Sequence, residues 1–500
     1  MNELSRERLR RLGSTPFDVL VIGGGIVGAG VARDAALRGL RTVLVDKSDF
    51  ASGTSSRSSR LLHGGLRYLA HGRIGLVREA SLEKMRLSRL APHLCEPLPF
   101  VFPVWKGGPW GLWKLSAGVH LYDMLCGGRN LGSSATLGPG GMLREVPGLR
   151  SDGLRGGVRY FDGLTNDARL VIDTLRSAEA AGAALLNYAT LESADRIAAE
   201  WRCTVRDELS GDPGEVRAQT VVNTAGAWAA GLAHSRVRLR LTKGVHLVAR
   251  RSSLPVTQAV VLSEGRRILF VIPWGERVIL GTTDTDYSGD PADVRTDAAD
   301  IEYILGVVND AFPEARLTPP DLISSWAGVR PLIASRQNGA GAPSDISRGH
   351  QIRVAEPGWI DVAGGKLTTY RLMAEQAVDR LGEFLRPKPP RSRTAQSPLA
   401  VEPDSVRFSG VLPPPFTREV VRHCCQKEWV VHLDDLMLRR TSWHFYHANQ
   451  AELAGGACCW MAEQLGWNGE RKRSELQRYY RMAEFIEARA GAFEHELLNP

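Results

Sequence analysis

A glycine-rich turn near the start of the chain constrains the fold more than any other feature. The apolar segment FDVLVI (17–22) predicts a buried strand, and it leads into Gly23-x-Gly25-x-x-Gly28 and a predicted helix over 26–38. In such a unit Gly23 permits a tight turn, Gly25 lets the backbone approach a pyrophosphate, and Gly28 lets the helix pack closely on the strand. The pattern therefore predicts a site where a dinucleotide phosphate lies on a helix N-terminus.

The segment TVLVD (42–46) predicts a second, parallel strand that completes a βαβ unit. Asp46 ends this strand, at the position where a carboxylate accepts hydrogen bonds from ribose hydroxyls. The same carboxylate would repel a 2′-phosphate, which argues against NADP. FAD and NAD both remain compatible with this unit alone.

Composition narrows the class of partner. The 500-residue chain is 43% apolar and 24% charged, as in ordinary globular proteins, and its net charge of +8 favours anionic partners. No nucleic-acid-binding signature is present, so we predict no nucleic-acid partner. The seven cysteines have no CxxC spacing, and we predict no metal site. No secretory segment and no run of 18 apolar residues occurs, so any membrane contact is predicted to be peripheral.

The later chain changes in character several times. Residues 239–283 contain short alternating segments typical of an antiparallel sheet. Buried strands are predicted at 221–223 and at 359–363, and the second runs into two glycines and a helix. Residues 386–415 are rich in Pro, Ser and Arg and are interpreted as a linker. After them, residues 417–493 have the apolar spacing of helices.

Three segments distinguish FAD from NAD. GTSSRSSR (53–60) and HGGLRY (63–68) offer hydroxyls, glycines and Arg67 to a pyrophosphate and to a flat ring approached closely. GGKLTT (364–369) has the form of a strand end, a turn and a helix start, whose N–H groups would stabilise a reduced flavin anion. An NAD enzyme has no need of such a cover, so FAD is the expected cofactor.

Taken together, these segments resemble a signature of FAD-dependent glycerol-3-phosphate dehydrogenases of the aerobic, bacterial type. The chain also lacks the EF-hand calcium loop of the longer mitochondrial forms. The similarity extends in order over nearly the whole chain, through VVNTAGAWA (221–229), LTKGVHLV (241–248), GTTDTDYSGDP (281–291), WAGVRPL (326–332), GGKLTTYR (364–371) and LDDLMLRRT (433–441).

The resemblance implies an α/β fold with three parts. These are a glutathione-reductase-like FAD-binding Rossmann domain, an antiparallel-sheet substrate domain and a helical C-terminal domain. We predict that the FAD-binding domain comprises residues 14–90, 155–235 and 336–385, the substrate or cap domain 91–154 and 236–335, the linker 386–415, and the helical domain 416–500.

The resemblance also assigns site residues. Catalysis is expected at His246, whose ordinary pKa suits proton transfer, and at Arg330, whose fixed charge suits a developing alkoxide. A lone histidine on a strand is more often a core residue, and which of the two residues is the base stays open. The substrate phosphate is expected at Arg67, Tyr68, Arg348 and Lys366. The cofactor is expected at Gly23, Gly25, Gly28, Asp46, Thr54, Ser55, His63, Gly65, Leu66, Gly226, Lys366, Leu367 and Thr368.

The implied reaction is oxidation of sn-glycerol 3-phosphate to dihydroxyacetone phosphate, with hydride transfer from C2 to flavin N5 and electrons passed to quinone. This implies a cytoplasmic enzyme associated peripherally with the cytoplasmic face of the inner membrane. The basic charge balance and the Trp- and Lys-containing segment 105–114 are compatible with an anionic membrane surface, although buried aromatic packing explains those tryptophans equally well.

Several alternatives stay open. One is a glycerol-3-phosphate oxidase that uses oxygen, and another is an amine or amino-acid oxidase of the same fold. A third, from a different class, is a non-catalytic flavin-binding scaffold whose C-terminal domain recruits partners. The sequence also leaves open whether two copies form a homodimer.

Overall fold

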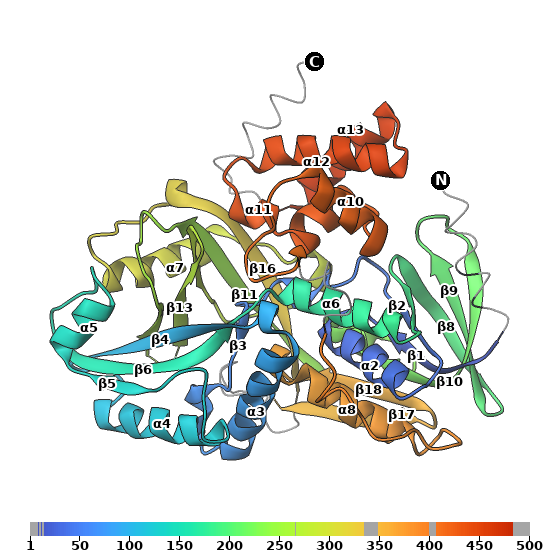
Figure 1. Ribbon diagram of the computed structural model, residues 1–500, viewed down its shortest axis with the longest axis horizontal. Helices are drawn as coiled ribbons and strands as arrows, with labels where there is room; N and C mark the ends of the chain where they lie inside the picture. Colours follow the sequence, from blue (N-terminus) through green and yellow to red (C-terminus); the bar gives the residue numbers. More distant parts are fainter. Residues whose placement is uncertain are drawn as a thin grey trace.

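Two β-sheets lie side by side in the computed structural model, with helices on their outer faces and a further group of helices across one end (Figure 1). The structure describes residues 9, 12, 15–265, 267–334, 349–399 and 407–483. No helix in these ranges is long and apolar enough to cross a membrane.

The first sheet carries the predicted βαβ unit. β1 (Phe17–Ile22) pairs in parallel with β2 (Thr42–Val45), and helix α2 (Ile26–Leu37) connects them, which confirms the prediction to within one residue. The strands predicted at 221–223 and 359–363 lie within β10 and β18. The sheet continues through β7 (Ala184–Leu186), β10 (Pro213–Asn223), β18 (Trp359–Gly364) and β17 (His350–Glu356), and it is extended by β8 (Ala189–Ile197) and β9 (Glu200–Asp207).

Small residues let α2 lie close to its neighbours. A Cβ atom at Gly28 would come within 1.8 Å of the Gly23 carbonyl oxygen, and one at Gly30 within 3.0 Å of the Tyr370 ring. Helices α6 (Asp167–Ala180) and α8 (Tyr370–Leu381) pack against α2. The buried helix is therefore fixed between the sheet and two other helices, and its N-terminus cannot shift independently of them.

The second sheet confirms the antiparallel region predicted over 239–283, but it is larger than predicted. The predicted strands form β11 (Leu239–Arg250), β12 (Ala259–Glu264), β13 (Arg267–Trp274) and β14 (Arg277–Gly281). They are joined by β3 (Leu61–Leu62), β4 (Glu96–Trp105), β5 (Ala135–Leu137), β6 (Leu154–Leu164), β15 (Thr285–Asp286) and β16 (Leu322–Ile333).

Four helices accompany this sheet: α3 (Ile74–Leu90), α4 (Leu112–Leu125), α5 (Pro139–Glu145) and α7 (Ala298–Ala311). Because β6 pairs within this sheet, residues 155–164 lie with the second sheet although we expected them in the FAD-binding domain. The division of the chain into domains stays a prediction.

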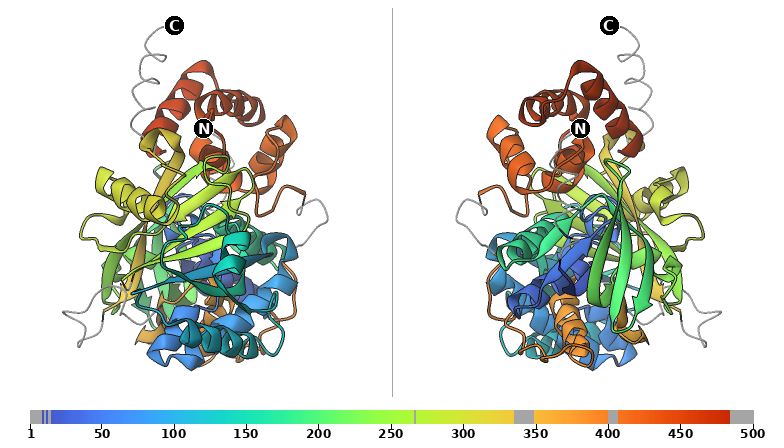
Figure 2. Two further views of the ribbon diagram at one scale, coloured as in Figure 1. Left: turned by 90° about the vertical axis from the view of Figure 1, so that its left-hand side faces the viewer. Right: turned by 90° about the vertical axis from the view of Figure 1, so that its right-hand side faces the viewer.

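The C-terminal helices, red in Figure 2, lie at one end of the molecule, opposite the end that holds α4 and α8. The helical prediction for residues 417–493 is confirmed up to residue 483, beyond which the structure is not described. All seven cysteines are free thiols. The helices are α10 (Arg418–Lys427), the π-helical turn η9 (Asp435–Arg440), α11 (Trp443–Tyr446), α12 (Gln450–Leu465) and α13 (Gly469–Met482).

Buried ion pairs fasten these helices to the first sheet. Asp49, three residues beyond Asp46, accepts hydrogen bonds from Arg439 Nε at 2.6 Å and from both terminal nitrogens of Arg440 at 2.7 and 2.8 Å. Burial alone would raise the pKa of Asp49, but the Arg440 and Arg439 guanidiniums hold it at about 2. The loop that follows the second strand is thus held in place from the far end of the chain.

Replacing Asp49 by alanine removes the carboxylate that two buried guanidiniums share. We expect Asp49→Ala to lower the free energy of unfolding by about 3–5 kcal/mol, as breaking one side of a buried ion pair does. The matched control is Asp310→Ala, which breaks the pair with Arg150 at a side chain that is 68% exposed, and should cost at most about 1 kcal/mol. Urea unfolding followed by circular dichroism measures both, and equal losses would contradict this account.

Candidate functional site

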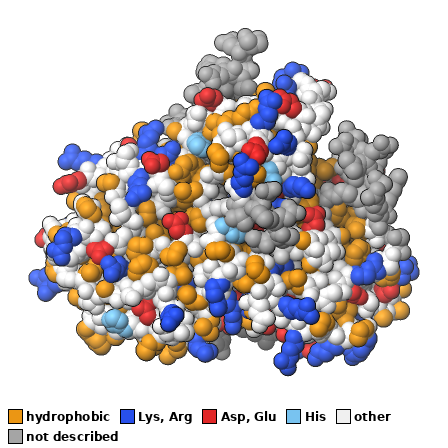
Figure 3. All heavy atoms as spheres, in the orientation of Figure 1, with side chains coloured by type: hydrophobic (Ala, Val, Ile, Leu, Met, Phe, Trp, Pro, Cys, Tyr) orange, Lys and Arg blue, Asp and Glu red, His pale blue; other side chains and the backbone are white. Residues whose placement is uncertain are grey.

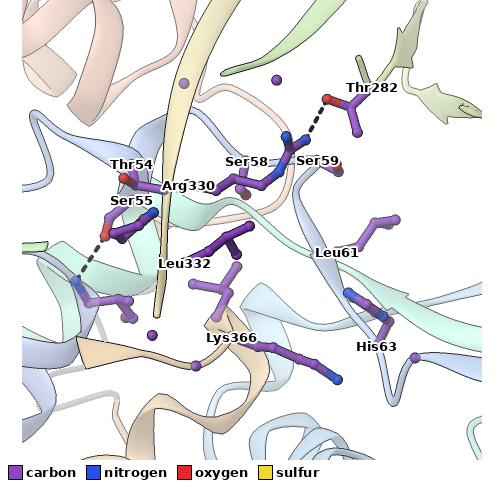
Figure 4. Close-up of a pocket in the computed structure, with 18 of the residues that line it drawn as sticks. Thr54, Ser55, Ser58, Ser59, Leu61, His63, Thr282, Arg330, Leu332 and Lys366 are labelled. Carbon is purple, nitrogen blue, oxygen red and sulfur yellow. Dashed lines mark hydrogen bonds between the residues drawn. The ribbon is translucent and has the colours of Figure 1, made fainter. Parts of the chain in front are cut away.

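A single cavity of about 1200 Å³ runs between the two sheets. It extends from the glycine turn after β1 to strands β11 and β16 of the second sheet, and the polar groups in its middle part are shown in Figure 4. Pockets for small ligands usually measure about 300–1000 Å³, so this one has room for a large cofactor and a small substrate together.

The N-terminus of α2 faces this cavity. Gly23 has a φ of +101°, a conformation that would be strained for a residue with a side chain. Gly25 has an extended conformation and caps the N-terminus of the helix. The Ile26 N–H donates to Ser55 Oγ at 3.0 Å, so a hydroxyl already lies where the helix dipole is positive. These groups suit a pyrophosphate, because its oxygens accept from N–H and hydroxyl donors alike.

Asp46 lies at the same end of the cavity. Its carboxylate accepts hydrogen bonds from the Gly24 N–H at 2.6 Å and the Ser48 N–H at 2.8 Å. Burial raises the pKa of Asp46 to about 6, and these two backbone donors only partly offset that effect. Hydroxyl donors from a ribose would favour the ionised form further.

The glycine loop after β3 forms another wall of the cavity. Thr368 Oγ1 accepts from the His63 N–H at 3.0 Å, and the Tyr122 hydroxyl accepts from the Gly64 N–H at 2.7 Å. Gly65 has a φ of +85°, and a Cβ there would lie 2.6 Å from the Tyr68 ring. The loop is thus held from two sides and allows a flat ring to approach its backbone.

Two cations flank the Tyr68 ring beside this loop. Lys366 Nζ lies 4.3 Å from the ring centroid and the Arg67 guanidinium 5.1 Å from it. Arg67 also donates to the Tyr68 hydroxyl at 3.3 Å. Lys366 precedes the short helix η8 (Leu367–Thr369), which leads into α8. The arrangement concentrates positive charge on one side of the cavity.

Arg330 projects from β16 and is held by the loop after β14. Its Nη2 donates to Thr282 Oγ1 at 2.8 Å, and its Nη1 donates to Asp284 Oδ1 at 3.2 Å (Figure 4). Gly244 opposite makes room for this guanidinium, because a Cβ there would lie 2.1 Å from Arg330 Nη2. The arginine is therefore oriented before any substrate binds.

His246 lies on β11, paired with Trp326 of β16 and Gly281 of β14. Its ring stacks on the Trp326 ring at 5.2 Å, and Nε2 lies 2.8 Å from Ser59 Oγ. Burial, with Arg330 and Arg60 nearby, lowers the pKa of His246 to about 3. The imidazole is therefore neutral near pH 7.

The cavity brings most of the predicted residues together, although their roles stay predictions. Three predicted residues do not line the cavity: Gly28, Tyr68 and Thr368. Gly28 allows the close packing of α2, and Thr368 holds the glycine loop by a hydrogen bond. Arg348 lies outside the described residues. The predicted residues that line the cavity are Gly23, Gly25, Asp46, Thr54, Ser55, His63, Gly65, Leu66, Arg67, Gly226, His246, Arg330, Lys366 and Leu367.

Many residues that line the cavity were not named by our sequence predictions, and among them are Ser59, Thr282, Asp284 and Trp228. Three of these four hold or flank catalytic candidates, and the Trp228 ring lies 4.3 Å from Lys47 Nζ. Each lies inside a segment that carried the family resemblance. The polar Ser, Thr and Asp side chains within those segments were the sequence signal that could have identified three of these residues.

A helix N-terminus, a buried carboxylate after the second strand and a braced glycine loop around one large cavity are the features of a dinucleotide-binding fold of the Rossmann type. A family model described as FAD dependent oxidoreductase matches residues 18–371, and one described as C-terminal domain of alpha-glycerophosphate oxidase matches residues 409–472. The chain therefore belongs to the FAD-dependent oxidoreductase family, and FAD is its cofactor.

Individual relatives are similar to this chain over most of its length. Glycerol-3-phosphate dehydrogenase 2 of Mycobacterium tuberculosis is 43% identical over 386 residues, which cover 75% of this chain and 65% of the relative. The chain thus spans slightly less than two thirds of that protein. Aerobic glycerol-3-phosphate dehydrogenase of Staphylococcus epidermidis is 37% identical, over 77% of this chain and 71% of the relative.

A solved structure shows the same fold. The glycerol-3-phosphate dehydrogenase from Bacillus halodurans, complexed with FAD, superposes with a TM-score of 0.76 at 30% identity, and the match covers 96% of this chain and 98% of that one. The predicted α/β fold with a helical C-terminal part is confirmed.

FAD binding should depend on pH through Asp46. Burial raises the pKa of this carboxyl to about 6, and ribose hydroxyls are expected to bind its ionised form. FAD affinity should therefore be constant above pH 7 and should fall by up to about tenfold for each pH unit below 6.

Asp46→Asn should bind FAD more weakly and lose this pH dependence. Fluorescence titration of the apoprotein between pH 5 and 8 measures both effects, with the exposed Asp152→Asn as the matched control. A pH dependence that survives in Asp46→Asn would show that another group is responsible.

Proposed function

We propose that the protein oxidises sn-glycerol 3-phosphate to dihydroxyacetone phosphate and passes the electrons to quinone. The single observation that carries this proposal is that Arg67, Lys366, Arg330 and His246 line the same cavity as the FAD-binding turn. Cations for a phosphate ester and groups for alcohol oxidation thus lie beside the cofactor site. The names of the relatives support the same substrate.

Arg67 and Lys366 are the proposed phosphate ligands. Both lie against the Tyr68 ring, which limits the freedom of these long side chains before the substrate arrives. A phosphate ester carries two negative charges near neutral pH and accepts hydrogen bonds from several donors at once. An amino-acid substrate would need a carboxylate clamp and a site for its amine instead.

Arg330 and His246 are the proposed groups for alcohol chemistry. Bound FAD would supply the two-electron acceptor for the C2 hydrogen. Arg330, held by Thr282 and Asp284, presents a permanent charge to the alkoxide that develops at C2. His246 is neutral at physiological pH and accepts the hydroxyl proton. The dianionic substrate offsets the nearby positive charge that disfavours imidazolium in the empty site.

An apolar part of the cavity supports quinone as the acceptor. Aromatic and aliphatic side chains form this wall, which leads from the glycine loop to α4: Phe100, Phe102, Trp110, Trp113, Leu121 and Phe270. A quinone ring with an isoprenoid tail fits such a surface. Oxygen needs no wall of this kind, so an oxidase is the less favoured alternative.

The surface beside α4 supports a peripheral contact with a membrane, which we place at the cytoplasmic face in keeping with the predicted location. Trp113, Met124 and Ile74 are 72%, 66% and 49% exposed. Trp113 also lines the cavity, so the cavity opens next to this apolar patch. Figure 3 shows hydrophobic and basic side chains together along the lower edge of the molecule, where α4 lies in Figure 1. Apolar anchors with nearby cations suit an anionic lipid surface.

The substrate can be tested directly on the flavin. Anaerobic glycerol 3-phosphate should abolish the oxidised-flavin absorption of the purified protein, whereas glycerol, glycine and proline should leave it unchanged. Arg330→Met and His246→Gln should each slow this reduction by about 100-fold, the usual effect of losing an oxyanion or acid–base group. Flavin that stays oxidised with the phosphate ester but is reduced by an amino acid would overturn the proposal.

Steady-state turnover with a soluble quinone, compared with oxygen alone, identifies the acceptor.

The membrane contact can be tested by sedimentation with vesicles. A Trp113→Ala, Met124→Ala variant should bind vesicles rich in phosphatidylglycerol at least about tenfold more weakly, because two exposed apolar anchors are lost. Its reduction by glycerol 3-phosphate in solution measures whether the site is intact. Ile197→Ala is the matched control, since Ile197 is 47% exposed in β8, far from α4 in the chain. Equal binding by all three proteins would locate the contact elsewhere or exclude it.

A further inference from the structure

His246 offers no open nitrogen to the cavity. Its side chain belongs to a residue that is only 2% exposed, and Nδ1 is buried with no hydrogen-bond partner among the described residues. Nε2 is covered by Ser59 Oγ at 2.8 Å. Trp326 stacks on one face of the ring, and Gly281 leaves room for it, because a Cβ there would lie 2.6 Å from Cδ2. With Nδ1 buried, the Ser59 hydroxyl lies on the route by which a proton from the cavity can reach Nε2.

Ser59 itself is half-buried and lines the cavity. Figure 4 shows it in the same part of the pocket as Arg330, which is proposed to face the developing alkoxide, and Thr282, which holds Arg330. A serine hydroxyl can accept one proton while it donates its own, so it can connect a substrate oxygen with a buried base.

Both neighbours of Ser59 are fixed by hydrogen bonds. Ser58 donates from its N–H and its hydroxyl to Asp167 Oδ2 at 2.9 and 2.6 Å, and its carbonyl accepts from Trp326 Nε1 at 3.1 Å. Arg60 has a φ of +56°, and its N–H donates to Ser58 Oγ at 3.0 Å. The turn is therefore held in a conformation that few side chains adopt, which needs support from its surroundings.

The Arg60 side chain provides that support. Its guanidinium lies 4.4 Å from the Trp274 ring and 5.2 Å from the Trp326 ring. The C-terminal helices close the arrangement, since Ser442 Oγ accepts from Nη2 at 3.2 Å and the Phe445 ring lies 5.7 Å away. Asp167 is the nearest carboxylate, at 4.0 Å from Nε. Two tryptophans, a phenylalanine and a serine thus surround the buried guanidinium of Arg60, the residue that follows Ser59.

We propose that Ser59 relays the proton between the reacting hydroxyl and His246, and that Arg60 is the positioning residue that holds Ser59. Arg60 is in turn held by Trp274, Trp326 and the C-terminal residues Ser442 and Phe445. The C2 hydroxyl proton passes to Ser59 Oγ as the Ser59 proton passes to His246 Nε2. The C2 hydrogen leaves with its electron pair to the oxidised flavin, and the C2–O bond becomes a carbonyl. The relay rests on the proposed function, and it gives the C-terminal helices a role in the active site.

Anaerobic stopped-flow reduction of the holoenzyme by glycerol 3-phosphate tests the relay. Ser59→Ala should slow flavin reduction on the order of 100-fold and change the substrate dissociation constant by less than about threefold, because only proton transfer is lost. Ser59→Thr keeps the hydroxyl and should retain a rate within about tenfold of the unmodified protein. The FAD content and flavin absorption spectrum of both variants should match those of the unmodified enzyme.

Rates in mixtures of H₂O and D₂O separate a relay from a merely structural role. Two protons move together in the relay, so the unmodified enzyme and Ser59→Thr should give a curved dependence on deuterium fraction, and Ser59→Ala a linear one. If Ser59→Ala reduces its flavin within about twofold of the unmodified rate, the relay is wrong while the proposed function stands. If glycerol 3-phosphate does not reduce the flavin of the unmodified enzyme, the proposed function and the relay are both wrong.

Arg60 is tested in the same assay. Arg60→Met should slow reduction by about tenfold or more at unchanged substrate affinity, as small misplacements of a reacting group do, and Arg60→Lys should recover much of the rate. Should Arg60→Met fail to fold, the Ser442→Ala, Phe445→Leu variant removes the C-terminal contacts alone and should still slow reduction severalfold. Unchanged rates in the foldable variants would overturn the positioning role.

Discussion

The contact between α2 and the turn that precedes it is the constraint on which the rest of the site depends. At Gly28 the helix approaches so closely that a Cβ would lie 1.8 Å from the Gly23 carbonyl oxygen and 2.7 Å from Thr224 Oγ1 on the segment after β10. This closeness lets the helix N-terminus face the cavity between the sheets. We expect the cofactor phosphate, the flavin ring and the substrate to follow one another along that cavity, from the first sheet to the second.

Charge is distributed unevenly along this line. Asp46 lies at the nucleotide end, where hydroxyl donors are expected, whereas Arg67, Lys366 and Arg330 lie at the substrate end. Burial, together with the charges of Arg330 and Arg60, keeps His246 neutral. Under the proposed function, the phosphate ester brings negative charge to the cations at the substrate end, and the neutral His246 takes up the hydroxyl proton.

Local rules made the first third of the site predictable. β1, α2 and β2 obey spacing and glycine requirements that act over a few residues, and the structure places them within one residue of the expected bounds. The second sheet was underestimated because β4, which pairs with β6 on one side, pairs with β12 on the other across a long stretch of chain. The pairing of Asp49 with Arg440 spans 391 residues, so no local sequence pattern predicts it. Ser59 likewise stood in a segment that we singled out, but its role depends on His246, which lies 187 residues away.

The most direct test of the central claim is a crystal structure of the protein with FAD and a non-oxidisable phosphate ester of similar size. The account predicts the pyrophosphate at the N-terminus of α2, the ester phosphate within hydrogen-bond distance of Arg67 and Lys366, and the carbon chain directed toward Arg330 and Ser59. An ester bound outside the cavity, or with its phosphate away from both cations, would contradict the account.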